Sequence, residues 1–205
     1  LSIDENKLEC WLMRPELAVY QRFFAELLRQ KPHIRTNDEE EMLALAGEVC
    51  AAPRGIFGMF NNADLHFPTV RDETGALVEI THGNYTHLME SPSRQVREET
   101  FKGLYATYAA WQNSLAAMLA GSVKKDVFAA KVRRYDSALA AALFAEDIPP
   151  AVYDNLLAGV RAHLPLFYRY LQLRRQALGL DELHMYDIYT PLAQERPREI
   201  SYPEP

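Results

Sequence analysis

Apolar residues recur along most of this chain at steps of three and four positions, which is the period of an amphipathic helix. Between Pro15 and Gln30, one helical face carries Leu17, Tyr20, Phe24, Leu27 and Leu28. Between Pro150 and Gly179, a similar stripe carries Val152, Leu156, Val160, Leu164, Phe167 and Leu171. We therefore expect a mainly α-helical protein in which each helix buries its apolar face.

Prolines and capping residues predict where the helices begin and end. Either Thr36 with Glu39 or Asn37 with Glu40 has the spacing of a capping box, in which two side chains satisfy free amides of the first turn. The helix that follows is expected to end before Pro53, because proline lacks the amide hydrogen that a helix interior needs.

A long central helix is expected over residues 91–121 and beyond. It contains an uncharged stretch between Lys102 and Lys124 that is about as long as a membrane-spanning helix. A polar Gln-Asn-Ser triplet at 112–114 and many alanines argue against a membrane span. We expect a helix that is buried among other helices, and no membrane partner.

One stretch departs from the helical period. The β-branched runs LHFPTVRD and LVEITH flank a Glu-Thr-Gly turn signal at 73–75, and Pro68 in the first run indicates an edge strand. An isolated hairpin is only marginally stable in water, so it must pack on helices or join other strands. The predicted fold class is therefore mainly α, a multi-helix domain with one β-hairpin at about 65–81.

The pattern divides the chain into three segments. Residues 1–62 form an N-terminal helical segment, residues 63–90 the β-hairpin and a short helix, and residues 91–205 a long-helix region. No internal repeat and no stretch of disordered composition separates them. We expect the three segments to form one continuous structural unit.

Charge and cysteine content narrow the possible classes of function. The 205 residues carry 28 acidic and 22 basic side chains, giving a net charge of −6 that is spread along the chain. Without a concentrated basic surface, nucleic acid is not expected as a partner. Cys10 and Cys50 are the two cysteines, and two isolated thiols favour a reducing compartment over a disulfide framework.

The spacing of the histidines does not fit a catalytic zinc site. None of the six is followed by glutamate, so the motif His-Glu-x-x-His, which supplies two zinc ligands and a general base, is absent. His82 and His87 are five positions apart, the wrong step for one helical face, and turn or capping roles fit them better. Serine, threonine and cysteine residues have no ordered base nearby. We predict no catalytic residue and no metal ligand in this chain.

Two clusters of polar and aromatic residues could contact a bound ligand. Tyr186, Asp187 and Tyr189 are candidate substrate-binding residues, since tyrosines offer an apolar face with a hydroxyl and Asp187 could orient one of them. The alternative is a buried aromatic junction in which Asp187 caps a neighbouring turn. The cationic run from Lys124 to Arg134 could attract a carboxylate of a ligand, but its pattern is more typical of the solvated face of a helix.

Three long stretches resemble oligoendopeptidase F, of the thimet-type family of zinc metallopeptidases. They are NNADLHFPTVRDETGALVEITHGNY at 61–85, SVKKDVFAAKVRRYDSALAAALFAEDIPPAVYDNLL at 122–157 and LRRQALGLDELHMYDIYTPL at 173–192. Residues 1–64 show a weaker likeness. The resemblance therefore covers nearly the whole chain, in the order that the family has.

The resemblance implies cytoplasmic, largely helical enzymes in which two lobes flank a deep channel. At its floor, zinc held by His-Glu-x-x-His and a later glutamate polarises a water molecule that attacks a peptide carbonyl. Those parts lie C-terminal to the stretches matched here. Leu1 in place of methionine and a helix-start signal at 201–204 favour a chain that continues in both directions.

We therefore expect the non-catalytic N-terminal portion of a zinc metalloendopeptidase that hydrolyses short peptides. It would form one wall of the substrate channel and depend on the missing C-terminal catalytic part, with zinc bound in the parent enzyme and not in this chain. One alternative is a stand-alone helical scaffold that binds peptides or a partner protein. Another is a fragment that complements a separate catalytic chain.

Overall fold

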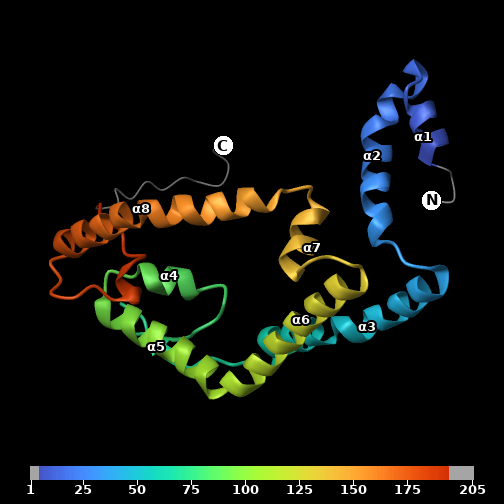
Figure 1. The fold of residues 1–205 in the computed structure, drawn as a ribbon. Coiled ribbons are helices and arrows are strands. Elements are labelled where there is room, and N and C mark those ends of the chain that lie inside the picture. The colour runs from blue at the N-terminus through green and yellow to red at the C-terminus, as the bar shows by residue number, and fades with distance from the viewer. Residues whose placement is uncertain (1–4, 194–205) are drawn as a thin grey trace, which may run out of the picture. The chain divides into compact units, whose positions relative to one another are not determined.

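The computed structural model describes residues 5–193, so the helix-start signal at 201–204 lies outside the described part. Its α-helices are α1 (Glu5–Leu12), α2 (Gln21–Gln30), α3 (Asn37–Met59), α4 (Tyr85–Glu90), α5 (Arg94–Ala110), α6 (Gln112–Val132), α7 (Ala138–Ala145) and α8 (Pro150–Ala177) (Figure 1). Short helical turns are η1 (Pro15–Tyr20), η2 (Lys31–His33), η3 (Phe60–Asp64) and η4 (Met185–Asp187). Strands β1 (Thr69–Arg71) and β2 (Leu77–Glu79) form one antiparallel sheet. The predicted fold class, mainly α with one hairpin, is confirmed.

The chain divides into two compact units, each built from two separate stretches. The first unit comprises Leu1–Phe57 and Ala117–Val152, and the second comprises Gly58–Ala116 and Tyr153–Pro205. Each unit is described below by itself. The three segments expected from the sequence, with boundaries after residues 62 and 90, stay a prediction.

The hairpin forms where its turn signal predicted it. Its register pairs Thr69 with Glu79, Val70 with Val78 and Arg71 with Leu77. In the turn, the Asp72 carboxylate accepts hydrogen bonds from the amides of Thr74 and Ala76 at 2.8 and 3.0 Å. Gly75 has a φ of +87°, a conformation that glycine adopts without the strain that a side chain would cause.

The hairpin packs on α4 and α5, and these contacts make the core of the second unit. One cluster of buried apolar side chains consists of Leu65, Phe67, Val70, Ile80, Leu88, Val96 and Leu104. Gly103 of α5 permits the close approach, because a Cβ atom there would lie 2.9 Å from Cγ of Pro68 and 3.1 Å from Cδ1 of Ile80. Of the two expected alternatives, packing on helices or joining other strands, the structure shows packing on helices.

Helix α3 continues past the proline that was expected to end it. Of the two possible capping boxes, the structure forms Thr36 with Glu39: the Thr36 amide donates to the Glu39 carboxylate at 3.0 Å. The helix then runs through Pro53 to Met59. A Cβ atom on Gly121 of α6 would lie 2.8 Å from Cγ of Pro53, so the proline ring packs closely on a second helix. This contact is not visible in the local sequence, and the prediction of a helix end at Pro53 was wrong.

The expected central helix is two helices. Helix α5 ends at Ala110, and Trp111 leaves the helical conformation with φ −110° and ψ 15° before α6 begins. The Trp111 ring packs edge-on against Phe60, with the ring centroids 5.4 Å apart. Because Phe60 is distant in sequence, the helical period alone could not reveal this break.

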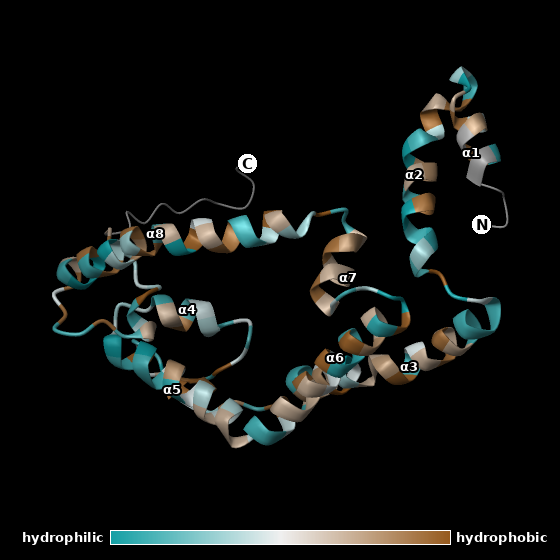
Figure 2. Ribbon diagram, viewed as in Figure 1, coloured by the Kyte–Doolittle hydropathy of each residue, from teal (hydrophilic) through white to brown (hydrophobic). Residues whose placement is uncertain are grey.

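Helix α8 has the predicted apolar stripe but does not bury it within the described chain. Val152, Leu156, Val160 and Phe167 are each more than half exposed, and Arg174 is the buried residue of this helix. Figure 2 shows apolar residues on α8 and along α3 and α6. The expectation that each helix buries its apolar face was therefore wrong for α8, and it was also wrong for α3, where no residue is buried. Periodicity shows that a face is apolar and not that this chain covers it.

By length and composition, the helical stretch Asn37–Asp64 could cross a membrane. Its most apolar window has a mean hydropathy of 1.3, and none of that window is buried within the described structure. The core helices of soluble proteins pass the same test. The stretch is a different one from the uncharged segment between Lys102 and Lys124.

Arg134 adopts a left-handed backbone at the end of α6. Its φ is +61°, where glycine is the usual residue. The Arg134 amide donates to the Lys131 carbonyl at 3.1 Å, and the Tyr135 amide donates to the Ala130 carbonyl at 2.9 Å. The helix therefore ends in a hydrogen-bonded turn that holds a strained residue.

Replacing Arg134 with glycine is expected to raise the free energy of unfolding by about 1 kcal/mol, because the left-handed conformation costs an ordinary residue about 1–2 kcal/mol. The control is Arg54→Gly inside α3, which is expected to lower it by about 1 kcal/mol. Chemical denaturation followed by circular dichroism measures both variants. Equal destabilisation by both would show that the backbone at Arg134 carries no strain in solution.

Candidate functional site

The three candidate substrate-binding residues lie in and just after η4, in the second unit. Asp187 is fully buried and Tyr186 is 6% exposed, whereas Tyr189 is exposed. The backbone thus turns the first two side chains inward and the third outward. A direct contact between a peptide and these residues stays a prediction, and in this structure Tyr189 is the one that solvent reaches readily.

The Asp187 carboxylate is held by two arginines of α5. Arg94 donates to both carboxylate oxygens, at 3.1 and 3.0 Å, and Arg97 donates to one of them at 3.0 Å. The amide of His184 donates to the other oxygen at 3.0 Å, which closes the turn that contains η4. These four hydrogen bonds occupy both oxygens, so the carboxylate acts within the protein as a structural anchor.

Burial and pairing act in opposite directions on this carboxylate. Burial raises the pKa of Asp187, but the hydrogen bonds from Arg94, the His184 amide and Arg97 lower it by more, so its pKa lies below the ordinary value. The same pairing raises the pKa of Arg94. Asp187 is therefore ionised at neutral pH and does not serve as a proton donor.

Arg97 and Arg174, both nearly fully buried, extend the cluster to the surrounding backbone. Arg97 donates to the carbonyls of Tyr186 at 3.0 Å and Ser91 at 2.7 Å. Arg174 of α8 donates to the Asp187 carbonyl at 3.0 Å and also to the Thr190 carbonyl. The segment after α8 is thereby fixed to both α5 and α8.

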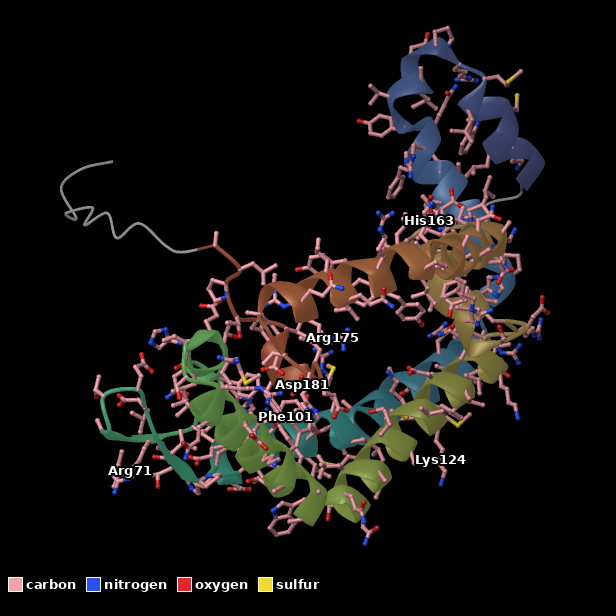
Figure 3. All side chains as sticks on the ribbon, turned by 90° about the vertical axis from the view of Figure 1, so that its left-hand side faces the viewer. Arg71, Phe101, Lys124, His163, Arg175 and Asp181 are labelled. Atoms are coloured by element: carbon pink, nitrogen blue, oxygen red, sulfur yellow. The ribbon has the colours of Figure 1, made fainter. Side chains whose placement is uncertain are left out.

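The Tyr186 ring sits within the same cluster. It stacks on His184 with centroids 4.9 Å apart, and the Arg94 guanidinium lies 5.3 Å from its centroid. Phe101, which is labelled in Figure 3, approaches its edge at 6.0 Å. The ring is therefore enclosed by aromatic and cationic groups of the chain itself.

Sequence reasoning missed the arginines that organise this cluster. Arg94 and Arg97 are three positions apart, which places them on one face of α5 with the buried residues Val96 and Thr100 close by. Arg174 falls within the generally apolar pattern of α8. A cation on a face that also carries buried residues is the signal that could have identified them, since buried arginines require partners.

An open cavity of about 360 Å³ borders the cluster. Its lining includes Glu73, His87, Glu90, Ser91 and Thr190. The Ser91 hydroxyl donates to the Glu73 carboxylate at 3.0 Å. Two carboxylates at this opening favour a cationic group over an anion as a ligand.

The described residues do not fit the zinc ion that the resemblance implies. Among residues 5–193, no group of three or more His, Cys, Asp or Glu side chains could hold a metal ion. His82 approaches Asn61, with Nε2 3.3 Å from Nδ2, and His87 lines the cavity. No step through a metal can therefore be derived from these residues.

Comparison with known proteins identifies the family. Residues 87–203 match the model described as Peptidase family M3, and residues 1–67 match the one described as Oligopeptidase F. The chain belongs to peptidase family M3. The resemblance to oligoendopeptidase F is thus confirmed.

Individual relatives show how much of the family's length is present. Oligopeptidase PepF of Bacillus subtilis is 43% identical over 205 residues, 100% of this chain and 31% of that protein. Group B oligopeptidase PepB of Streptococcus agalactiae is 44% identical over 95% of this chain and 32% of that protein. The crystal structure of oligoendopeptidase-F from Enterococcus faecium matches with a TM-score of 0.87 at 40% identity, over 94% of this chain and 38% of that chain. This M3 chain therefore spans about a third of the length of these relatives.

Substituting Asp187 with asparagine is expected to lower the free energy of unfolding at pH 7 by about 3–5 kcal/mol, because it leaves buried arginine charge uncompensated. The control is Asp181→Asn at an exposed position of the preceding loop, with an expected change within about 0.5 kcal/mol. Urea denaturation of the two variants and the unchanged chain measures these effects.

The cost of Asp187→Asn also depends on pH. The folded pKa lies below the unfolded value of about 3.9, so the stabilisation is complete above about pH 4 and is lost as the pH falls through the folded pKa. The difference in the free energy of unfolding between the unchanged chain and the variant should therefore become smaller as the pH falls from 7 to about 3. A difference that stays constant over this range would contradict the ion pairing.

Proposed function

We propose that this M3 chain is the non-catalytic N-terminal portion of an oligoendopeptidase F-like zinc metalloendopeptidase that hydrolyses short peptides. Within that enzyme it forms part of the wall of the substrate channel. The observation that carries the proposal is similarity along the whole chain to oligopeptidases about three times as long. The missing zinc motif agrees with this assignment.

The exposed apolar faces support a role as one part of a larger protein. Leu45 and Val49 of α3 are about three-quarters exposed, and Leu156 and Leu166 of α8 are nearly two-thirds exposed. Contiguous apolar surface on a soluble protein commonly marks a face that another surface covers. In the proposed enzyme, the C-terminal catalytic part covers these faces and carries the zinc, and the enzyme is cytoplasmic. Neither nucleic acid nor a membrane belongs to the proposal.

The stand-alone scaffold remains the competing proposal, because a partner protein could cover the same faces. The two differ in what the chain does when a catalytic part is supplied. A portion of an enzyme restores peptide hydrolysis to a relative that lacks the corresponding third. A scaffold binds its ligand without restoring hydrolysis.

The test exchanges this chain for the corresponding third of the Bacillus subtilis oligopeptidase PepF, over which the two are 43% identical. Hydrolysis of a short quenched fluorescent peptide and of a folded protein is then measured. We expect the chimaera to cleave the peptide and spare the folded protein, and this chain alone to cleave neither.

The control is the relative with that third deleted. We expect it to lose peptide hydrolysis or its selectivity for short substrates, since a channel wall excludes folded proteins by its shape. Unchanged hydrolysis and unchanged size selectivity after the deletion would contradict the wall role. Hydrolysis and stoichiometric zinc in this chain alone would contradict the non-catalytic assignment.

A further inference from the structure

Within the first unit, α3 and α6 run antiparallel, and their contacts include a proline–glycine contact and an ion pair. At one, the ring of Pro53 meets Gly121. At the other, the Arg133 guanidinium donates to both oxygens of the Glu40 carboxylate, each at 3.0 Å. Figures 1 and 3 both show the two helices side by side. Two such contacts fix the spacing of the helices.

A groove of about 570 Å³ opens between the helices near the Arg133–Glu40 contact. Its apolar walls are Met42, Leu43, Ala46, Phe128 and Val132. Its volume lies within the range of about 300–1,000 Å³ that is usual for ligand pockets. The groove can therefore accept several apolar side chains of a bound molecule.

The carboxylates beside the groove are already used by the protein. Glu39 accepts hydrogen bonds from the amide and hydroxyl of Thr36 at 3.0 and 2.8 Å and pairs with Arg35 at 2.6 Å. These bonds, that from the Thr36 amide first, lower the pKa of Glu39 to about 2. Glu40 is occupied by Arg133 and by the Arg35 amide. Neither carboxylate is left to receive a cationic ligand.

Two cations of the same groove are uncommitted. Lys131 and Arg134 line it, and within the described structure their side chains have no hydrogen-bond or ion-pair partner. Lys131 lies in the last turn of α6 and Arg134 just after this helix, and both line the groove together with its apolar walls. The local charge therefore favours an anionic group bound next to apolar ones.

Arg134 also has an unfavourable backbone conformation. Its backbone is left-handed, with a φ of +61°, a conformation that is unfavourable for a residue with a side chain. Glycine would end the helix without this cost. Strain retained at one position of a site is a reason to look for a role of that side chain, and here the side chain supplies half of the uncommitted charge.

From this arrangement we propose that the α3–α6 groove is a binding site for an apolar peptide segment that carries carboxylates. Its apolar side chains pack on Leu43 and Phe128, while its carboxylates pair with Lys131 and Arg134. The sequence pattern favoured a merely solvated cationic face, and the groove adds the apolar wall that a solvated face lacks. The inference goes beyond the proposed function, because binding at this groove requires no hydrolysis.

The test measures fluorescence anisotropy of two short labelled peptides titrated with this chain. One contains leucine, phenylalanine and two glutamates, and its twin has lysines in place of the glutamates. We expect the acidic peptide to bind about tenfold more tightly at low salt, equivalent to about 1.4 kcal/mol, with the difference narrowing as salt rises. Equal binding of the two peptides would overturn the proposal.

The decisive variant is the double substitution Lys131→Glu with Arg134→Glu. It should reverse the preference, so that the basic peptide binds more tightly, a gain that misfolding cannot produce. The matched control is Lys124→Glu in α6 with Arg54→Glu in α3, which changes the net charge by the same amount at two positions outside the lining of the groove. We expect the control to keep both affinities within about twofold. A control that reverses the preference equally would overturn the proposal.

Further measurements test for two other occupants of the groove, the remaining polypeptide of the enzyme and a second copy of this chain. In the chimaera with the Bacillus subtilis relative, the acidic peptide should still bind, whereas loss of binding would show that the remaining polypeptide fills the groove. Analytical sedimentation of this chain tests whether a second copy of it occupies the groove. Self-association that the double substitution abolishes and the acidic peptide does not disrupt would likewise overturn the proposal. The proposed function is tested by hydrolysis, whereas the groove proposal is tested by peptide binding and self-association. Failure of one proposal can therefore be distinguished from failure of the other.

Discussion

The burial of one carboxylate between two arginines is the constraint on which the second unit depends. Taking Asp187 out of water is costly unless its charge is matched, and Arg94 and Arg97 match it from a helix some ninety residues earlier. Arg174 then ties the backbone of the same segment to α8. As a consequence, Tyr186 is buried, and the fixed segment forms part of the wall of the cavity beside the cluster. The cluster is thus a structural junction between distant parts of the chain.

The first unit is organised differently, because its helices meet at a few points and leave apolar surface between and around them. Pro53 against Gly121 and Glu40 with Arg133 set the spacing of α3 and α6, and the groove follows from that spacing. Carboxylates near the groove pair with arginines, as Asp187 does in the second unit. The exposed apolar faces and the length of the M3 relatives both support the proposal that this chain functions within a larger protein.

Features set by a few neighbouring residues could be predicted from the sequence. The helical class follows from apolar periodicity, and the hairpin follows from two β-branched runs around a turn that contains Gly75. Ser137 caps α7 through its hydroxyl, which accepts from the Ala140 amide at 3.0 Å, and Gly179 adopts a positive φ after α8. Each of these signals acts within about one helical turn or one strand pair. The candidate peptide contacts could be named from residue type, but their exposure could not.

What the sequence determined by itself was therefore the mainly helical class, the position of the hairpin and the absence of the zinc motif from this chain. The tertiary structure alone decided that Pro53 lies inside a helix and that Trp111 interrupts one, because Gly121 and Phe60 are far away in sequence. It also decided that Asp187 is an anchor and that α8 stays exposed. Local periodicity reports which face of an element is apolar, whereas burial and charge pairing depend on which distant surface meets that face.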